Sequence, residues 1–231
     1  MNTKISSSLK YLWLLLILPL AFLFTGCGQL DEQASINKSG NYQTAESSAL
    51  TESLGTQTDI DKTNGYRITA KLKSSDADVG INAIVKADEI AAKVSGTVDG
   101  QNKSGYMYFT DGKLYTEADG QKVCITYATG FDIDKLIALI TKISTASVSI
   151  NINDYVVSLD GVNNILEKAG NNFRITMQAG QVLYLNFDSN NKLVAMQSSF
   201  DSESLKTEIT VSTFSGDIDF PSFSDYKTLG L

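Results

Sequence analysis

A chain of 231 residues is long enough for one domain or at most two, and with 42% apolar and 19% charged residues it can form a folded core. The net charge of −7 makes nucleic acid and anionic membrane surfaces poor electrostatic partners. The absence of histidine removes the commonest general base and the commonest metal ligand.

The first 26 residues have the order of a secretory signal peptide. Lys4 and Lys10 form a basic region, residues 11–24 (YLWLLLILPLAFLF) form an apolar one, and two small residues precede Cys27. A membrane-spanning helix needs about 20 apolar residues. The apolar run is therefore short for a membrane-spanning helix. Two alternatives to a cleaved signal peptide are a retained membrane anchor and a structural role for Cys27.

The sequence FTGC (residues 24–27) resembles the lipobox of bacterial lipoproteins, in which a small residue precedes the cysteine. The departure from that pattern is Phe24, where leucine is usual. The resemblance implies that the Cys27 thiol carries a diacylglyceryl group and that cleavage makes Cys27 the mature N-terminus. The protein would then be lipid-anchored on the extracytoplasmic face of a bacterial cell membrane. Its net charge would be −9, because Lys4 and Lys10 are lost.

Residues 27–60 are rich in Ser, Thr, Gln and Asn and contain few large apolar side chains. Such a segment cannot offset its ordering entropy by burial. We therefore predict a flexible tether that reaches about 30 Å on average. The folded domain is expected over residues 61–231.

Alternating apolar and polar residues predict a meander of six antiparallel strands over residues 66–128. Asp111-Gly112 and Asp119-Gly120 are hairpin signals within it. Cys124 lies in one of these strands and is expected to be a small buried apolar residue. Four more strands are predicted over residues 172–179, 181–188, 192–200 and 204–214.

The segment between the two groups of strands predicts helices. Asp132 can cap a helix over residues 132–143, whose apolar face includes Leu136, Ile137 and Ile140. This helix is more apolar than a surface helix needs to be. Residues 147–152 and 155–159 follow it as short strand candidates.

A second, shorter helix is predicted after Asp160, which can act as its cap. Ile165 and Leu166 lie on its apolar side, and Gly170 stands where a C-terminal stop is expected. Antiparallel strands with helices set apart indicate an α+β fold with one large curved sheet of about 10 to 12 strands.

A lipobox, a polar tether and a many-stranded antiparallel sheet with an inserted apolar helix resemble the LolA-like and LppX/LprG-like lipoproteins. The resemblance covers residues 64–220 and is one of architecture. It implies an unclosed half-barrel with one or two helices packed on its concave face, and a hydrophobic cavity for acyl chains between them. The candidate residues lining such a cavity are Tyr106, Tyr108, Tyr184, Leu136, Ile137 and Ile140.

The sequence offers little reaction chemistry. Without histidine there is no Ser-His-Asp triad and no HExxH zinc motif, and no phosphate-binding glycine loop occurs. We expect no catalytic residue, no cofactor and no metal site. The first functional hypothesis is a lipoprotein that binds a lipid or another hydrophobic ligand. The alternative is a surface lipoprotein with a filled core that acts as a protein- or glycan-interaction module.

Overall fold

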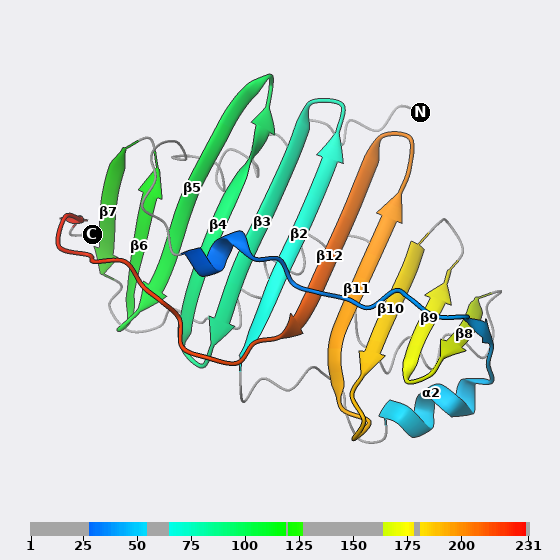
Figure 1. Ribbon diagram of the computed structural model, residues 1–231. Coiled ribbons are helices and arrows are strands. Elements are labelled where there is room, and N and C mark those ends of the chain that lie inside the picture. Colours follow the sequence, from blue (N-terminus) through cyan, green and yellow to red (C-terminus); the bar gives the residue numbers. More distant parts are fainter. Residues whose placement is uncertain (1–27, 55–64, 119, 127–163, 178–180, 230–231) are drawn as a thin grey trace.

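The computed structural model describes residues 28–54, 65–118, 120–126, 164–177 and 181–229, and within them the chain forms one sheet of 13 strands (Figure 1). Two helical segments accompany the sheet. The elements are η1 (Gly28–Asp31), β1 (Gln43–Thr44), α2 (Ser47–Leu54), β2 (Tyr66–Ser74), β3 (Ala77–Lys86), β4 (Glu89–Val98), β5 (Gln101–Thr110), β6 (Lys113–Ala118), β7 (Gln121–Thr126), β8 (Ile165–Ala169), β9 (Asn172–Thr176), β10 (Gln181–Phe187), β11 (Leu193–Asp201), β12 (Leu205–Thr213) and β13 (Lys227–Leu229).

The strands lie in the order β1-β8-β9-β10-β11-β12-β2-β3-β4-β5-β6-β7-β13. Every neighbouring pair is antiparallel except β13, which runs parallel to β7. Strands β2 to β7 form a six-stranded antiparallel meander, which confirms the prediction for residues 66–128. The outer edges of β8 and β7 are each paired by a short strand, which covers backbone groups that would otherwise attract another chain.

The hairpin between β5 and β6 shows how the sequence sets the register. Asp111 and Gly112 both have positive φ, 51° and 68°, as a type I′ turn requires. Thr110 and Lys113 are therefore direct partners, and the pairing continues to Gly105 opposite Ala118. The strong hairpin signal at Asp111-Gly112 is confirmed.

The predicted helix after Asp160 is wrong where the structure describes it. Residues 165–169 form strand β8, with Leu166 buried and Ile165 54% exposed, as expected from side chains that alternate between faces. Gly170, with a φ of 60°, begins a two-residue turn that pairs Ala169 with Asn172. The glycine is thus a hairpin residue and not a helix stop, and pairing with β9 overrides the local helical spacing.

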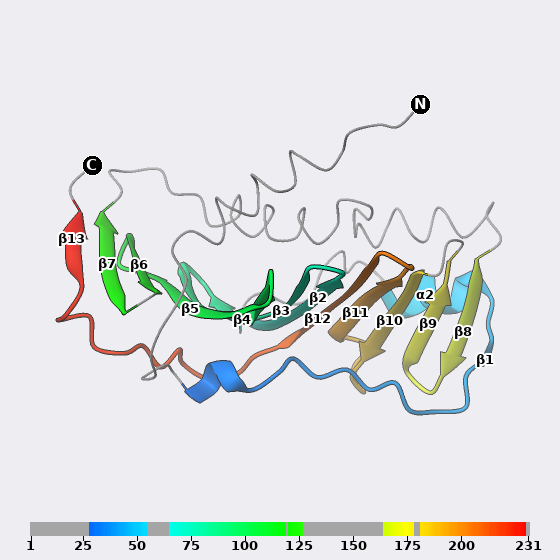
Figure 2. The same ribbon diagram turned by 90° about the horizontal axis from the view of Figure 1, so that it is seen from above.

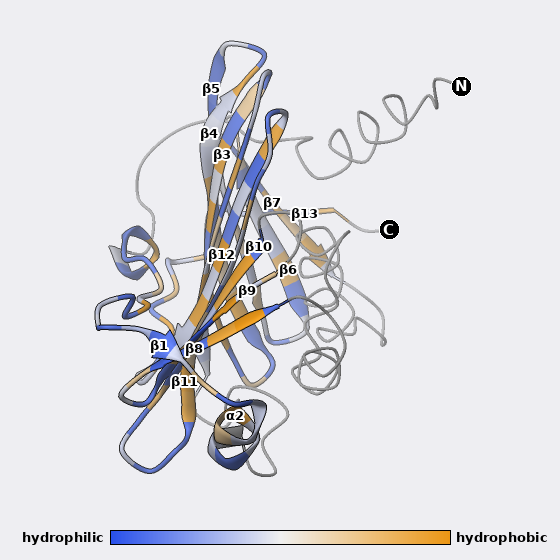
Figure 3. Cartoon of the chain, turned by 90° about the vertical axis from the view of Figure 1, so that its right-hand side faces the viewer, coloured by the Kyte–Doolittle hydropathy of each residue, from blue (hydrophilic) through white to orange (hydrophobic). Residues whose placement is uncertain are grey.

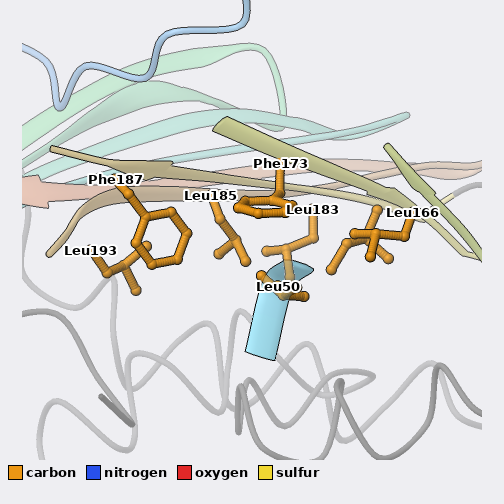
Figure 4. Close-up of a cluster of buried hydrophobic side chains, with 8 residues drawn as sticks. Leu50, Leu166, Phe173, Leu183, Leu185, Phe187 and Leu193 are labelled. Carbon is orange, nitrogen blue, oxygen red and sulfur yellow. The ribbon is translucent and has the colours of Figure 1, made fainter. Parts of the chain in front are cut away.

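The two faces of the sheet are covered by different parts of the chain (Figure 2). We call the side on which α2 lies the concave face, because β6, β7 and β13 bend toward it. Leu50 of α2 packs there against Leu183, Leu185 and Phe173 (Figure 4). Strands β8 to β10 beside this helix are largely hydrophobic (Figure 3).

Two extended segments cross the opposite, convex face (Figure 2). The N-terminal strap, residues 28–42, begins with η1 over β3 and β4 and runs to the β8 edge. The C-terminal strap, residues 214–226, leads from β12 to β13. Leu30 of the first strap and Phe214 of the second are buried in one cluster with Tyr108.

The prediction of a flexible tether over residues 27–60 is wrong for residues 28–54. Leu30 and Leu50 are both fully buried, one on each face of the sheet. The composition of this segment did not reveal its order, because side chains of the sheet supply most of the hydrogen bonds that hold the strap backbone. Arg67 and Asn186, for example, form hydrogen bonds with the strap backbone.

The fold-class prediction is confirmed in its coarser form, a large unclosed and mostly antiparallel sheet with helix on one side. The sheet has 13 strands, more than expected. In the part of the chain that the structure describes there is a single α-helix, α2, which the sequence did not predict. The predicted helix over residues 132–143 and the strand candidates over 147–159 lie outside the described residues.

Candidate ligand-binding face

The concave face of the central strands is a continuous apolar surface. Residues on β12 and β2 to β5 form its buried cluster, and Leu114 of β6 and Met107 of β5 pack against it. The buried members are Tyr66, Ile68, Ala83, Val85, Ile90, Ala92, Phe109 and Ile209. A second cluster of buried apolar side chains lies on the same face beside α2.

Strand register explains why these side chains gather on one side. Ile68 lies opposite Ala83, and Ala83 lies opposite Ala92, so one residue from each of three strands points the same way. Ile90 and Phe109 form the next such pair. Except for the Tyr66 hydroxyl, the side chains of this cluster offer no hydrogen-bonding groups, so the surface suits a hydrocarbon better than a polar ligand.

Two hollows are bounded by residues that the structure describes. One has a volume of about 20 Å³ beside Val79, Val94 and Gly96, enough for about one water molecule. The other, about 270 Å³, lies near the β10–β11 turn beside Asp188 and Phe214, and its walls are partly polar. Neither of these two hollows has both the size and the apolar lining of a lipid cavity, and the ligand surface proposed below is the concave face.

The predicted lining residues Tyr106 and Tyr108 lie on the other side of the sheet. They alternate with Met107 and Phe109 along β5 and therefore face the convex side. Tyr108 is fully buried, with its ring centroid 5.7 Å from that of Phe223 in the C-terminal strap. The strap thus fills the space around these tyrosines, and their assignment to a concave cavity is wrong.

Tyr184 is likewise a convex-face residue, because its neighbour Leu185 points toward α2. Its ring packs edge-on against Tyr42 of the N-terminal strap, with centroids 6.2 Å apart. Nearby, Arg174 donates two hydrogen bonds of 2.7 Å to the Glu167 carboxylate. These bonds hold the pKa of Glu167 below its ordinary value. We interpret Tyr42, Tyr184, Arg174 and Glu167 as a structural cluster that fixes the strap to the sheet.

The other predicted site residues, Cys27, Leu136, Ile137 and Ile140, lie outside the described residues. Met107, which was not among the predicted lining residues, lies on the concave face with Phe109. The sequence signal is the Asp111-Gly112 turn, which places Phe109 opposite Leu114, and Met107 lies two residues before Phe109 on the same face.

A buried polar group lies beneath the C-terminal strap. Tyr226 is 8% exposed, and its hydroxyl donates a 3.2 Å hydrogen bond to the Glu117 carboxylate, which lies 3.9 Å from Lys122 Nζ. Burial, followed by the charge of Glu117, raises the pKa of Tyr226 above its ordinary value of 10.0. This hydrogen bond joins the C-terminal strap to the sheet. Loss of the Tyr226 proton would remove the bond and weaken the contact.

Stability is expected to fall as the pH rises above about 10, the ordinary pKa of an unfolded tyrosine. The folded chain keeps the Tyr226 proton where the unfolded chain has lost it, so the stabilisation is complete below that pH and is lost above it. Urea midpoints measured across this range should fall less steeply in Tyr226→Phe, because the substitution removes the contribution of Tyr226. Part of the fall should remain, because burial also raises the pKa values of Tyr42 and Tyr115. Identical slopes in both proteins would contradict the assignment.

Comparisons with known proteins leave the family open. No protein family and no curated protein matches this chain. The crystal structure of LprF from Mycobacterium bovis is similar over 78% of this chain and 99% of that chain, with 12% identity and a TM-score of 0.39. The DNA polymerase III subunit beta from Pseudomonas aeruginosa is similar over 80% of this chain and 69% of that chain, with 10% identity and a TM-score of 0.13.

None of the described helices is long and apolar enough to cross a bilayer. At these identities and TM-scores, neither solved structure assigns a function to the chain.

Proposed function

We propose that this protein is a lipid-anchored extracytoplasmic lipoprotein of a bacterial envelope, attached through Cys27, that binds a lipid or another hydrophobic ligand at the concave face. It acts as a binding protein and not as an enzyme. The observation that carries the proposal is the cluster of apolar and aromatic side chains that extends along the concave face from β12 to β6.

The dimensions of this surface support an acyl chain as the ligand. Six neighbouring strands from β12 to β6 cover about 24 Å, at about 4.8 Å per strand spacing. That exceeds the roughly 15 Å of one bilayer leaflet, half of an apolar core about 30 Å thick. Met107 adds a flexible side chain that adapts to an irregular partner.

A surface lipoprotein that meets a protein or a glycan, without any ligand cavity, is the alternative. The filled convex face favours it: the Tyr115 ring stacks on Phe223 of the C-terminal strap with centroids 3.8 Å apart. Among the described residues, the rings of the C-terminal strap occupy the space beside Tyr108 and Tyr115. The two functions differ in what the concave face holds.

Native mass spectrometry can decide between them. We expect the chain from residue 28 onward, expressed in bacteria and purified without detergent, to carry non-covalent lipid adducts. Met107→Trp adds bulk to the concave face and is expected to weaken binding about tenfold, or about 1.4 kcal/mol. Tyr106→Trp is the matched control, because the two residues are half-buried neighbours on β5 that face opposite sides.

Adducts that survive in Tyr106→Trp and disappear in Met107→Trp would place the ligand on the concave face. Bare protein in every preparation, even after incubation with phospholipid vesicles, would contradict ligand binding and favour the interaction module.

A further inference from the structure

The segment directly after Cys27 is fixed to the convex face of the sheet. η1 begins at Gly28 and contacts β3 and β4. Two residues later, Leu30 is fully buried against Ile84 and Ala91. The point of attachment to the folded domain therefore lies immediately beside the residue that would carry the lipid.

Polar side chains of the sheet hold the backbone of this first turn. Arg67, which is 7% exposed, donates to the carbonyls of Gln29 and Glu32, the latter at 2.9 Å. Asn82 donates to the carbonyl of Leu30 at 3.1 Å. These bonds satisfy groups that would otherwise be left without partners at a partly buried surface.

Further along, the strap is held again by β2 and then by one more strand, β10. Thr69 accepts a 2.8 Å hydrogen bond from the Ala34 amide. Asn186 accepts from the Asn37 amide at 2.6 Å and donates to the Asn37 carbonyl at 2.9 Å. These two bonds fix the position of Asn37, and with it the strap, relative to strand β10.

The two straps are also joined to each other. The Gln29 side chain donates to the Asp217 carbonyl at 3.1 Å and accepts from the Asp219 amide at 2.9 Å. The anchored end of the chain thus contacts both the sheet and the C-terminal strap, and it has no free length in which to move.

We infer that the lipid anchor holds the convex face of the sheet against the bilayer and turns the concave face away from it. The inference rests on the proposed lipidation of Cys27. Consecutive Cα atoms are about 3.8 Å apart, so an acylated Cys27 begins about one residue from the docked Gly28. A free tether of about 30 residues would reach about 30 Å and permit any orientation.

The charges around η1 suit this contact. A mature net charge near −9 would repel an anionic bilayer, but near the anchor three acidic side chains are each paired with a basic one, which leaves little local field. The pairs are Asp31 with Lys93 at 2.5 Å, Glu32 with Arg67 at 2.8 Å, and Asp217 with Lys86 at 2.5 Å.

Two isosteric substitutions can measure the orientation. Ser35 is exposed on the N-terminal strap and Ser48 is exposed on α2, on opposite sides of the sheet. Ser35→Cys and Ser48→Cys, each in a full-length Cys124→Ser background, are processed in bacteria, labelled with a fluorophore and reconstituted in phosphatidylcholine vesicles. The vesicles carry a spin-label quencher on the lipid head group.

We expect the label at position 35 to be quenched several-fold more strongly than the label at position 48. Insertion of about 20 Gly and Ser residues after Gly28 is expected to abolish the difference, because such a linker reaches about 25 Å. Equal quenching without the linker, or stronger quenching at position 48, would overturn the orientation while leaving the anchor intact. Chains that do not float with the vesicles would show that the anchor itself is absent.

Discussion

Replacing Arg67 by methionine is expected to lower the free energy of unfolding by about 3 kcal/mol and to free the N-terminal strap from the sheet. The guanidinium binds two strap carbonyls and the Glu32 carboxylate, and it lies 5.4 Å from the Phe214 ring centroid. Methionine keeps part of the apolar stem but donates no hydrogen bond. Urea denaturation measures the loss, and hydrogen exchange of residues 28–37 shows the release.

Lys73→Met is a matched control on the same strand and the same face. Lys73 also forms a 2.8 Å ion pair, with Asp78, but both side chains are more than 60% exposed. Solvent screens such a pair, so its removal should leave the urea midpoint and the strap exchange unchanged. An equal effect of both substitutions would mean that Arg67 stabilises the protein only through its charge. Unchanged exchange in Arg67→Met would mean that Leu30 alone holds the strap.

The meander was predictable because its signals are local. Alternation with a period of two and the Asp-Gly turn at residues 111–112 specify both the strands and their register within about ten residues. The strands from β9 to β12 were predictable for the same reason. Their position beside β2 was not, because the pairing of β12 with β2 joins residues far apart in the sequence.

The straps were unpredictable for a related reason. A polar segment with a few apolar residues resembles a disordered tether when it is considered alone. It docks here because Arg67 of β2, Asn82 of β3 and Asn186 of β10 form hydrogen bonds with its backbone. Only the assembled sheet brings these donors together.

For the candidate site, the sequence identified which strands are apolar but not which face each aromatic residue occupies. Tyr108 and Phe109 are adjacent, and either could face the concave side until a buried partner fixes the register. The C-terminal strap decides it, because its phenylalanines surround Tyr108. The predicted lining tyrosines, Tyr106, Tyr108 and Tyr184, thus lie on the convex face. The concave face is lined mainly by aliphatic residues, with Tyr66, Met107 and Phe109.

Substituting Cys27 by serine is expected to abolish lipid attachment completely and to leave the precursor uncleaved. The thiolate is the nucleophile that takes the diacylglyceryl group, and a serine hydroxyl at neutral pH is a far weaker one. Metabolic labelling with radioactive palmitate and the intact mass of the purified protein measure both steps.

Cys124→Ser is the control, since Cys124 is a free cysteine that is only 5% exposed in strand β7. It should retain full labelling, because a buried thiol on a paired strand cannot reach a membrane-bound modifying enzyme. If Cys27→Ser were still cleaved and fractionated like the wild type, the anchor would be lost from the proposal, and with it the orientation of the convex face. The apolar concave surface would then belong to a secreted binding protein, whose ligand would have to come from solution and not from the bilayer beside it.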